Sequence, residues 1–221
     1  MKAVIFGSTG MVGNYLTDSI SYLSQYEEII IAVRRPLATT PPRVKQLIVD
    51  FDKLDEDLKD INADVVFCCL GTTIAKAKSK DNFRKVDLEY PAMIAKHFAG
   101  KGTKRFIVIS SIGANAASSN FYLRTKGEME VAVLSSGIHD IAIVRPGLLL
   151  GNREEFRAGE RFAGFLMKHL DWLLTGSWQK YRPIHGRTLA IAMLVLAESV
   201  KGIKIIESEA LKIVAKKFTE K

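Results

Sequence analysis

The sequence predicts an α/β protein built on a doubly wound parallel sheet. Short apolar runs alternate with segments of helical spacing along the 221 residues. The apolar runs are nearly continuous, as expected for strands that are buried on both faces. A glycine-rich stretch follows the first run directly, and this position is typical of a turn that leads from a strand into a helix.

Each element is expected where its pattern is clearest. Apolar runs predict strands at residues 2–6, 28–33, 46–49, 63–70, 105–109, 140–144 and 203–207. Helical spacing predicts helices at residues 10–24, 83–98, 122–134 and 188–199, followed by a charged terminal helix. Residues 147–185 interrupt the alternation and contain both tryptophans and many basic residues. We expect one domain over residues 1–221, in which residues 147–185 form a small C-terminal cap above the carboxyl edge of the sheet.

Composition restricts the class of protein. Hydrophobic residues make up 48% of the chain and charged residues 25%, as in globular proteins. No apolar run reaches about 18 residues, so no transmembrane helix is expected. The net charge of +8 comes from scattered basic residues without zinc-finger spacing, so nucleic acid is not an expected partner. No histidine or cysteine set has the spacing of metal ligands, and no metal is expected.

The cysteines and the first residues predict a cytoplasmic location. Cys68 and Cys69 are adjacent and would point to opposite faces of a strand, which disfavours a disulfide framework. The apolar run near the first residue is too short for the core of a signal peptide. Both observations suggest a reducing compartment, most simply the cytoplasm.

The glycine-rich stretch predicts a dinucleotide site. It reads Gly7-Ser8-Thr9-Gly10-Met11-Val12-Gly13, with the glycines spaced as G-x-x-G-x-x-G. Glycine allows a tight turn, a close approach of the backbone to a pyrophosphate, and close packing of helix on strand. An ordinary turn between a strand and a helix is the alternative. The position of the stretch after a predicted strand favours a Rossmann fold.

Residues after the second, third and fourth predicted strands extend this site. Arg34 and Arg35 stand where an NAD site carries an acidic residue, and a guanidinium would pair with a 2′-phosphate. We therefore expect NADP(H) rather than NAD(H), with a pair of surface arginines as the alternative. Asp50-Phe51 would approach the adenine, although Asp50 has the alternative role of a turn or capping residue. Leu70-Gly71-Thr72 follows the fourth strand, where glycine permits close backbone approach to a cofactor or a simple turn.

A candidate catalytic set follows the fifth predicted strand. This strand ends in Ser110-Ser111, and a Tyr-x-x-x-Lys pattern places Tyr122 and Lys126 on one helix face. The tyrosine hydroxyl would exchange a proton with a carbonyl or alcohol, and the ammonium would lower the pKa of that hydroxyl. A serine hydroxyl, that of Ser111 first and Ser110 second, would orient the same substrate oxygen. Ser110, Tyr122 and Lys126 would also contact the cofactor.

Together these motifs resemble the short-chain dehydrogenase/reductase family, in particular its atypical branch similar to the Tat-interacting-protein-like oxidoreductases. The resemblance covers nearly the whole chain, through residues 7–13, 108–130 and 143–151. It implies Ser111, Tyr122 and Lys126 as a catalytic triad. It also implies that Pro146-Gly147-Leu148-Leu149 lies near the nicotinamide. The chain departs from the family in two places: Cys-Cys-Leu-Gly replaces an Asn-Asn-Ala-Gly phrase, and Asp87 stands where an asparagine is usual.

The leading hypothesis is an NADP(H)-dependent oxidoreductase that transfers hydride to or from a carbonyl or alcohol on a small-molecule substrate. The alternatives are an NADP(H)-binding regulator or scaffold with a protein partner, and an epimerase or dehydratase of sugar-nucleotide type. Residues 161–174 carry an apolar stripe that fits a core or cap helix, a membrane-surface contact or a homodimer interface. His185 is a further candidate for substrate or cofactor binding, against a structural role.

Overall fold

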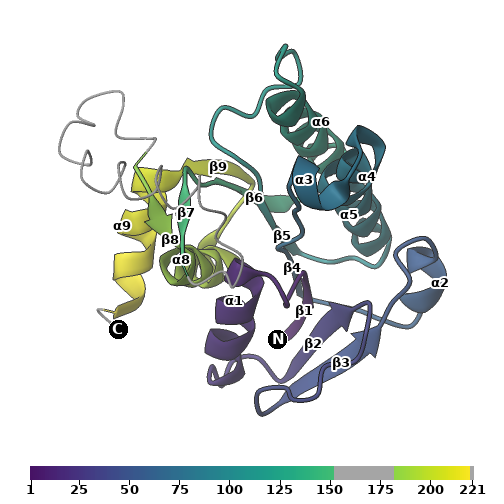
Figure 1. Cartoon of the computed structure of the whole chain (residues 1–221). Helices are drawn as coiled ribbons and strands as arrows, with labels where there is room; N and C mark the ends of the chain where they lie inside the picture. Colours follow the sequence, from purple (N-terminus) through teal and green to yellow (C-terminus); the bar gives the residue numbers. More distant parts are fainter. Residues whose placement is uncertain (152–181, 220–221) are drawn as a thin grey trace.

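A seven-stranded, fully parallel sheet forms the centre of the protein in a computed structural model that describes residues 1–151 and 182–219 (Figure 1). The strand order is β3-β2-β1-β4-β5-β6-β9. The strands are β1 (Lys2–Phe6), β2 (Glu28–Val33), β3 (Val44–Ile48), β4 (Val65–Cys68), β5 (Arg105–Ile109), β6 (Asp140–Arg145) and β9 (Ile203–Glu207). Two further short strands, β7 (Leu149–Leu150) and β8 (Ile184–His185), pair in parallel with each other.

Helices cover both faces of the sheet. They are α1 (Met11–Ser21), α2 (Leu54–Asp57), α3 (Ile74–Ala77), α4 (Lys80–Arg84), the π-helix η1 (Lys85–Glu89), α5 (Tyr90–Gly100), α6 (Phe121–Leu134), α8 (Gly186–Ser199) and α9 (Ser208–Thr219). In Figure 1 the helices α1, α8 and α9 lie on one side of the sheet, and α5 and α6 lie on the other. This arrangement confirms the predicted doubly wound Rossmann fold.

Alternation along each strand divides the core into two layers. Successive side chains of a strand point to opposite faces. In β1, Ala3 and Ile5 pack in the layer that contains α1, α8 and α9, whereas Val4 and Phe6 pack in the layer that contains α5 and α6. All four side chains are at most 1% exposed, which explains why the strand reads as a continuous apolar run.

Most predicted strands have the observed limits, and the differences have local causes. The strands predicted at 2–6, 28–33, 105–109 and 203–207 match β1, β2, β5 and β9. The prediction at 63–70 is too long at both ends, because β4 spans only Val65–Cys68, although Cys69 still donates its amide to Phe6 O of β1 at 2.9 Å. The helix predicted at 83–98 is wrong in form, because α4, η1 and α5 share that stretch. Most of the predicted cap, residues 152–181, lies outside the described residues.

The glycine-rich loop is closed tightly between β1 and α1. The amide of Gly10 donates to Gly7 O at 3.0 Å, and the amide of Asn14 donates to Gly10 O at 2.8 Å. Gly7 has a φ of +81°, which favours glycine strongly. A Cβ on Gly13 would lie 2.1 Å from Gly7 O, so only glycine fits at this contact of helix with strand. The loop thus has the close backbone packing that its glycines predict.

Gly13→Ala should destabilise the fold, because the new methyl group would overlap a backbone oxygen that has no room to move. We expect a loss of about 1–3 kcal/mol or more in the free energy of unfolding, measured by chemical denaturation. Gly100→Ala is the matched control: a Cβ at this last position of α5 meets nothing within 4 Å. The control should be neutral or stabilising by up to about 1 kcal/mol. Equal losses in the two variants would contradict the packing described for the loop.

Candidate active site

A pocket of about 810 Å³ lies at the carboxyl ends of the central strands. It is formed by the glycine loop after β1, the segment after β4, the end of β5, the first turns of α6 and the segment after β6. In open parallel sheets, ligands bind at this edge. Fourteen of the residues expected at a site line it: Thr9, Gly10, Met11, Val12, Leu70, Gly71, Thr72, Ser110, Ser111, Tyr122, Lys126, Pro146, Gly147 and Leu149.

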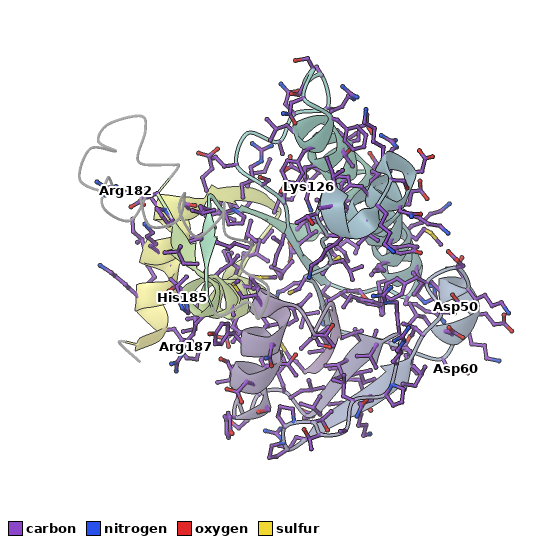
Figure 2. All side chains as sticks on the ribbon, in the orientation of Figure 1. Asp50, Asp60, Lys126, Arg182, His185 and Arg187 are labelled. Atoms are coloured by element: carbon purple, nitrogen blue, oxygen red, sulfur yellow. The ribbon has the colours of Figure 1, made fainter. Side chains whose placement is uncertain are left out.

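The remaining candidates lie outside the lining of this pocket. They are Gly7, Ser8, Gly13, Arg34, Arg35, Asp50, Phe51 and Leu148. Gly7 and Gly13 pack against each other within the glycine loop. Leu148 is 41% exposed. Arg34 and Arg35 are exposed immediately after β2. Figure 2 shows Asp50 beside α2, well away from Lys126.

A buried ion pair forms the floor of the pocket. The Lys126 Nζ atom lies 2.7 Å from Asp87 Oδ1, and both residues line the pocket. The second carboxylate oxygen, Asp87 Oδ2, accepts the backbone amide of Thr72 at 2.8 Å. Asp87 is 1% exposed and Lys126 is 4% exposed. One carboxylate therefore joins η1, α6 and the segment after β4.

The charge of Lys126 depends on these contacts. Burial alone would lower the pKa of the ammonium, because it penalises the charged form. Attraction to Asp87 and Tyr122, together with the hydrogen bond that Lys126 donates to Asp87, outweighs burial and raises the pKa of Lys126 above its ordinary value of 10.5. Lys126 is thus held as a cation next to the tyrosine.

An aromatic cluster fixes the position of Tyr122. The Tyr122 ring lies 5.7 Å from that of Phe83, which is fully buried on α4, and Phe83 lies the same distance from Phe121. Asn120, which precedes the first residue of α6, caps this helix: its side-chain oxygen accepts the amide of Leu123 at 3.1 Å. The cap begins the helix one residue before Tyr122, so Tyr122 and Lys126 are set one turn apart on the pocket side.

The two serines at the end of β5 differ in their surroundings. The Ser110 hydroxyl is buried, and no described residue forms a hydrogen bond with it. The Ser111 hydroxyl is more accessible and donates to Ile112 O at 3.3 Å. Both serines line the pocket, so either hydroxyl can serve a bound molecule.

Around Asp50, the structure favours the turn role. Asp50 Oδ1 accepts the amide of Asp52 at 3.0 Å, which closes a local turn. The Phe51 side chain is 6% exposed, and its ring lies 4.8 Å from that of Tyr90. Burial raises the pKa of Tyr90, and the charge of Arg34 opposes this shift to a smaller extent.

His185 and the cysteines have structural roles. His185 Nδ1 accepts the amide of Arg187 at 3.2 Å and caps α8 (Figure 2), and the His185 ring lies 5.7 Å from that of Tyr15. Burial raises the pKa of the Cys68 thiol to about 12 and that of Cys69 further, so neither is a reactive thiolate at neutral pH. Among the described residues there is no cluster of potential metal ligands, and no helix is long and apolar enough to cross a membrane.

Sequence reasoning missed part of the pocket. Asp87 was noted as a departure from a family pattern and was not included among the site residues. Asn14, Thr73, Lys76 and Ile109 also line the pocket. A charged residue among the apolar positions of a predicted helix was the available signal for Asp87.

Known proteins resemble this chain over most of its length. A family model described as HIM1 matches residues 37–171. Protein HTATIP2 of Rattus norvegicus is 33% identical over 213 residues, which cover 94% of this chain and 86% of the rat protein. Protein FMP52 of Candida albicans, named as mitochondrial, is 36% identical over 160 residues, which cover 70% of each chain.

Solved structures share the fold at low sequence identity. MoeE5 in complex with UDP-glucose and NAD has a TM-score of 0.69 at 14% identity, over 100% of this chain and 82% of MoeE5. Human epimerase family protein SDR39U1 with NADPH has a TM-score of 0.59 at 17% identity, over 93% of this chain and 73% of the human chain. These likenesses support the assignment of a Rossmann-type fold.

The expectation of a cytoplasmic location is wrong. Several FMP52 relatives, from different fungi, are named as mitochondrial. The expectation depended on the adjacent cysteines and on the short apolar run near the first residue. Cysteines that form no disulfide framework indicate reducing conditions, but they do not distinguish one reducing compartment from another.

The family assignment follows from the extent of these matches. The HIM1 model spans more than half of the 221 residues, and rat HTATIP2 aligns over 94% of them. The chain therefore belongs to the HIM1 family, and it is an atypical short-chain dehydrogenase/reductase similar to HTATIP2.

Proposed function

We propose that the chain is an NADP(H)-dependent oxidoreductase acting on a carbonyl or alcohol. The observation that carries the proposal is the convergence of Tyr122, Lys126 and the serines 110 and 111 in one pocket with the glycine loop. A bound nicotinamide would supply or accept the hydride. The residues of the chain would bind and orient the reactants and move the proton.

The residues of the pocket fit a dinucleotide. The glycine loop exposes backbone at the start of α1, which favours an anion such as a pyrophosphate. The Ser110 hydroxyl is buried at the pocket wall without a partner among the described residues, so a bound molecule would satisfy it. The relatives in fold were solved with NAD or NADPH, which agrees with this use of the loop.

The proposed chemistry uses each polar group of the pocket. The Tyr122 hydroxyl donates a proton to the substrate oxygen in reduction and removes it in oxidation. The Lys126 ammonium stabilises the phenolate that forms on Tyr122 and donates to a ribose hydroxyl. Ser111 orients the substrate oxygen, and Ser110 assists it or contacts the cofactor.

The relatives suggest where the protein acts, and the pairing of β7 with β8 bears on how its chain is organised. The mitochondrial FMP52 relatives support a mitochondrial location for this chain. We retain residues 1–221 as one cofactor-binding domain in which residues 147–185 cap the pocket. The short pair β7–β8 supports this, because it brings the two ends of the cap segment together beside the pocket.

A second candidate function is a cofactor-binding regulator with little turnover. The observation in its favour is the Asp87–Lys126 ion pair. The negative charge of Asp87 offsets the positive charge of Lys126, so the ammonium stabilises a phenolate on Tyr122 less. A sugar-nucleotide epimerase is a third, since MoeE5 was solved with UDP-glucose and NAD.

NADPH should bind more tightly than NADH, because Arg34 and Arg35 would pair with the 2′-phosphate. In the double variant Arg34→Ala/Arg35→Ala, the NADPH dissociation constant should rise about tenfold or more, while NADH binding changes little. Fluorescence titration measures both constants. Lys201→Ala removes a charge from a residue outside the pocket and should change neither. Equal affinities of the wild type for the two cofactors would refute the 2′-phosphate argument.

Tyr122→Phe should retain NADPH binding and lose turnover. The substrate would be the aldehyde or ketone that the wild type reduces fastest in a panel, followed through the absorbance of NADPH. We expect a fall of about 10²–10⁴-fold in kcat, because the proton donor is gone while the ring remains. Tyr22→Phe, at a side chain that is 71% exposed, is the control and should keep full activity. Full turnover in Tyr122→Phe would rule out the mechanism and favour the regulator.

A further inference from the structure

We propose that Asp87 is a positioning residue that holds the Lys126 ammonium charged and directed at the pocket while it fixes the Thr72 side of the same pocket. The proposal rests on the proposed function for what the pocket does. The contacts that support it are independent of that function.

Asp87 uses both carboxylate oxygens in separate contacts. Oδ1 lies 2.7 Å from Lys126 Nζ, and Oδ2 accepts the Thr72 amide at 2.8 Å. An ammonium has three N–H donors, so the bond to Asp87 leaves two for Tyr122 or a bound molecule. Because the Lys126 side chain is only 5% exposed, its ammonium cannot turn toward bulk water without moving this network.

The other groups near Lys126 cannot replace Asp87. The groups that act on its charge are Asp87 from η1, Tyr122 from its own helix α6 and Cys68 from β4. Burial raises the pKa of Cys68 to about 12, so its thiol is neutral at physiological pH. Lys76, from α3, lines the same pocket and carries the same sign of charge as Lys126. Within the described part of the chain, Asp87 is therefore the anion that opposes the cost of burying the ammonium.

The π-helix brings Asp87 to this position. η1 is one wide turn between α4 and α5, and it directs Asp87 inward while Lys85 points outward to Asp52 at 2.7 Å. Wide turns of this kind are frequent at functional sites. The turn thus places a carboxylate opposite the catalytic face of α6.

The test is the titration of Lys126 itself, because the proposal requires that the Asp87 carboxylate keep this ammonium charged. The ε-carbon signal of Lys126 is followed by NMR against pH in cofactor-free protein and is identified by its loss in Lys126→Met. In wild type this signal should titrate above those of exposed lysines. In Asp87→Asn, which keeps the side-chain shape and removes the charge, it should titrate at least about one pH unit below wild type.

Glu130→Gln is the matched control. Glu130 is 4% exposed on α6, one turn beyond Lys126, and pairs with Arg145 through two hydrogen bonds. The variant removes another buried carboxylate, one that lies on the same helix as Lys126, and should leave the Lys126 titration unchanged. The proposal is overturned if Asp87→Asn titrates like wild type, or if Glu130→Gln shifts Lys126 as far.

Two further outcomes keep the test decisive. If Asp87→Asn does not fold, the wild-type titration decides, and a Lys126 that titrates below the exposed lysines overturns the proposal. NADPH binding separates this inference from the proposed function. If the Asp87→Asn change lowers the Lys126 titration in a protein that does not bind NADPH, the role of Asp87 is supported and the NADP(H)-dependent function is refuted. If the protein binds NADPH tightly but Asp87→Asn does not shift the Lys126 titration, the role of Asp87 is refuted and cofactor binding is supported.

Discussion

The buried ammonium of Lys126 depends on the carboxylate of Asp87, and the arrangement of the pocket depends on both. A charged group removed from water is costly unless it is paired and hydrogen-bonded. Removal of one member of such a pair typically costs about 3–5 kcal/mol, because the other charge stays buried. The two oxygens of Asp87 satisfy Lys126 on α6 and the amide of Thr72 after β4, so the pair also links two walls of the pocket.

The parallel sheet explains why these walls meet. Its strands all end at the same edge, so the glycine loop after β1, Thr72 after β4 and the serines after β5 lie around one pocket although they are far apart in the sequence. The core beneath them is closed on both faces by helices. Packing of α4 against the first turn of α6, through Phe83 and Tyr122, then sets the tyrosine in place from the side.

The sequence was sufficient for the sheet because strands buried on both faces leave a simple signal. The continuous apolar runs at 2–6, 28–33 and 105–109 matched the strands, and the glycine spacing located the loop. The sequence was insufficient to predict η1. A π-helical turn contains the same apolar residues as an α-helical turn, so the pattern of apolar residues does not distinguish the two. Asp87 was missed as a site residue for a related reason: its partner, Lys126, is distant in sequence and meets it only in the folded chain. The burial of the Phe51 ring was not recognisable either, since an aromatic residue at the end of a strand can pack in the core as readily as against a ligand. The role of Arg34 at the cofactor stays a prediction.

The wide turn of η1 also lets two nearby residues of one helical segment, Asp87 and Tyr90, face different parts of the sheet. An α-helix advances by about 100° per residue, so an extra residue in one turn rotates everything that follows onto another face. After η1, Tyr90 faces Phe51 at the β3 side of the sheet, while Asp87, within the turn, faces Lys126 at the β5 side. A regular helix that kept Tyr90 in place would direct residue 87 elsewhere and leave the ammonium without its anion. The irregular backbone is therefore best explained by the charge that it supplies to the pocket, since the packing of Phe83 and Phe98 on either side requires only apolar residues at helical spacing.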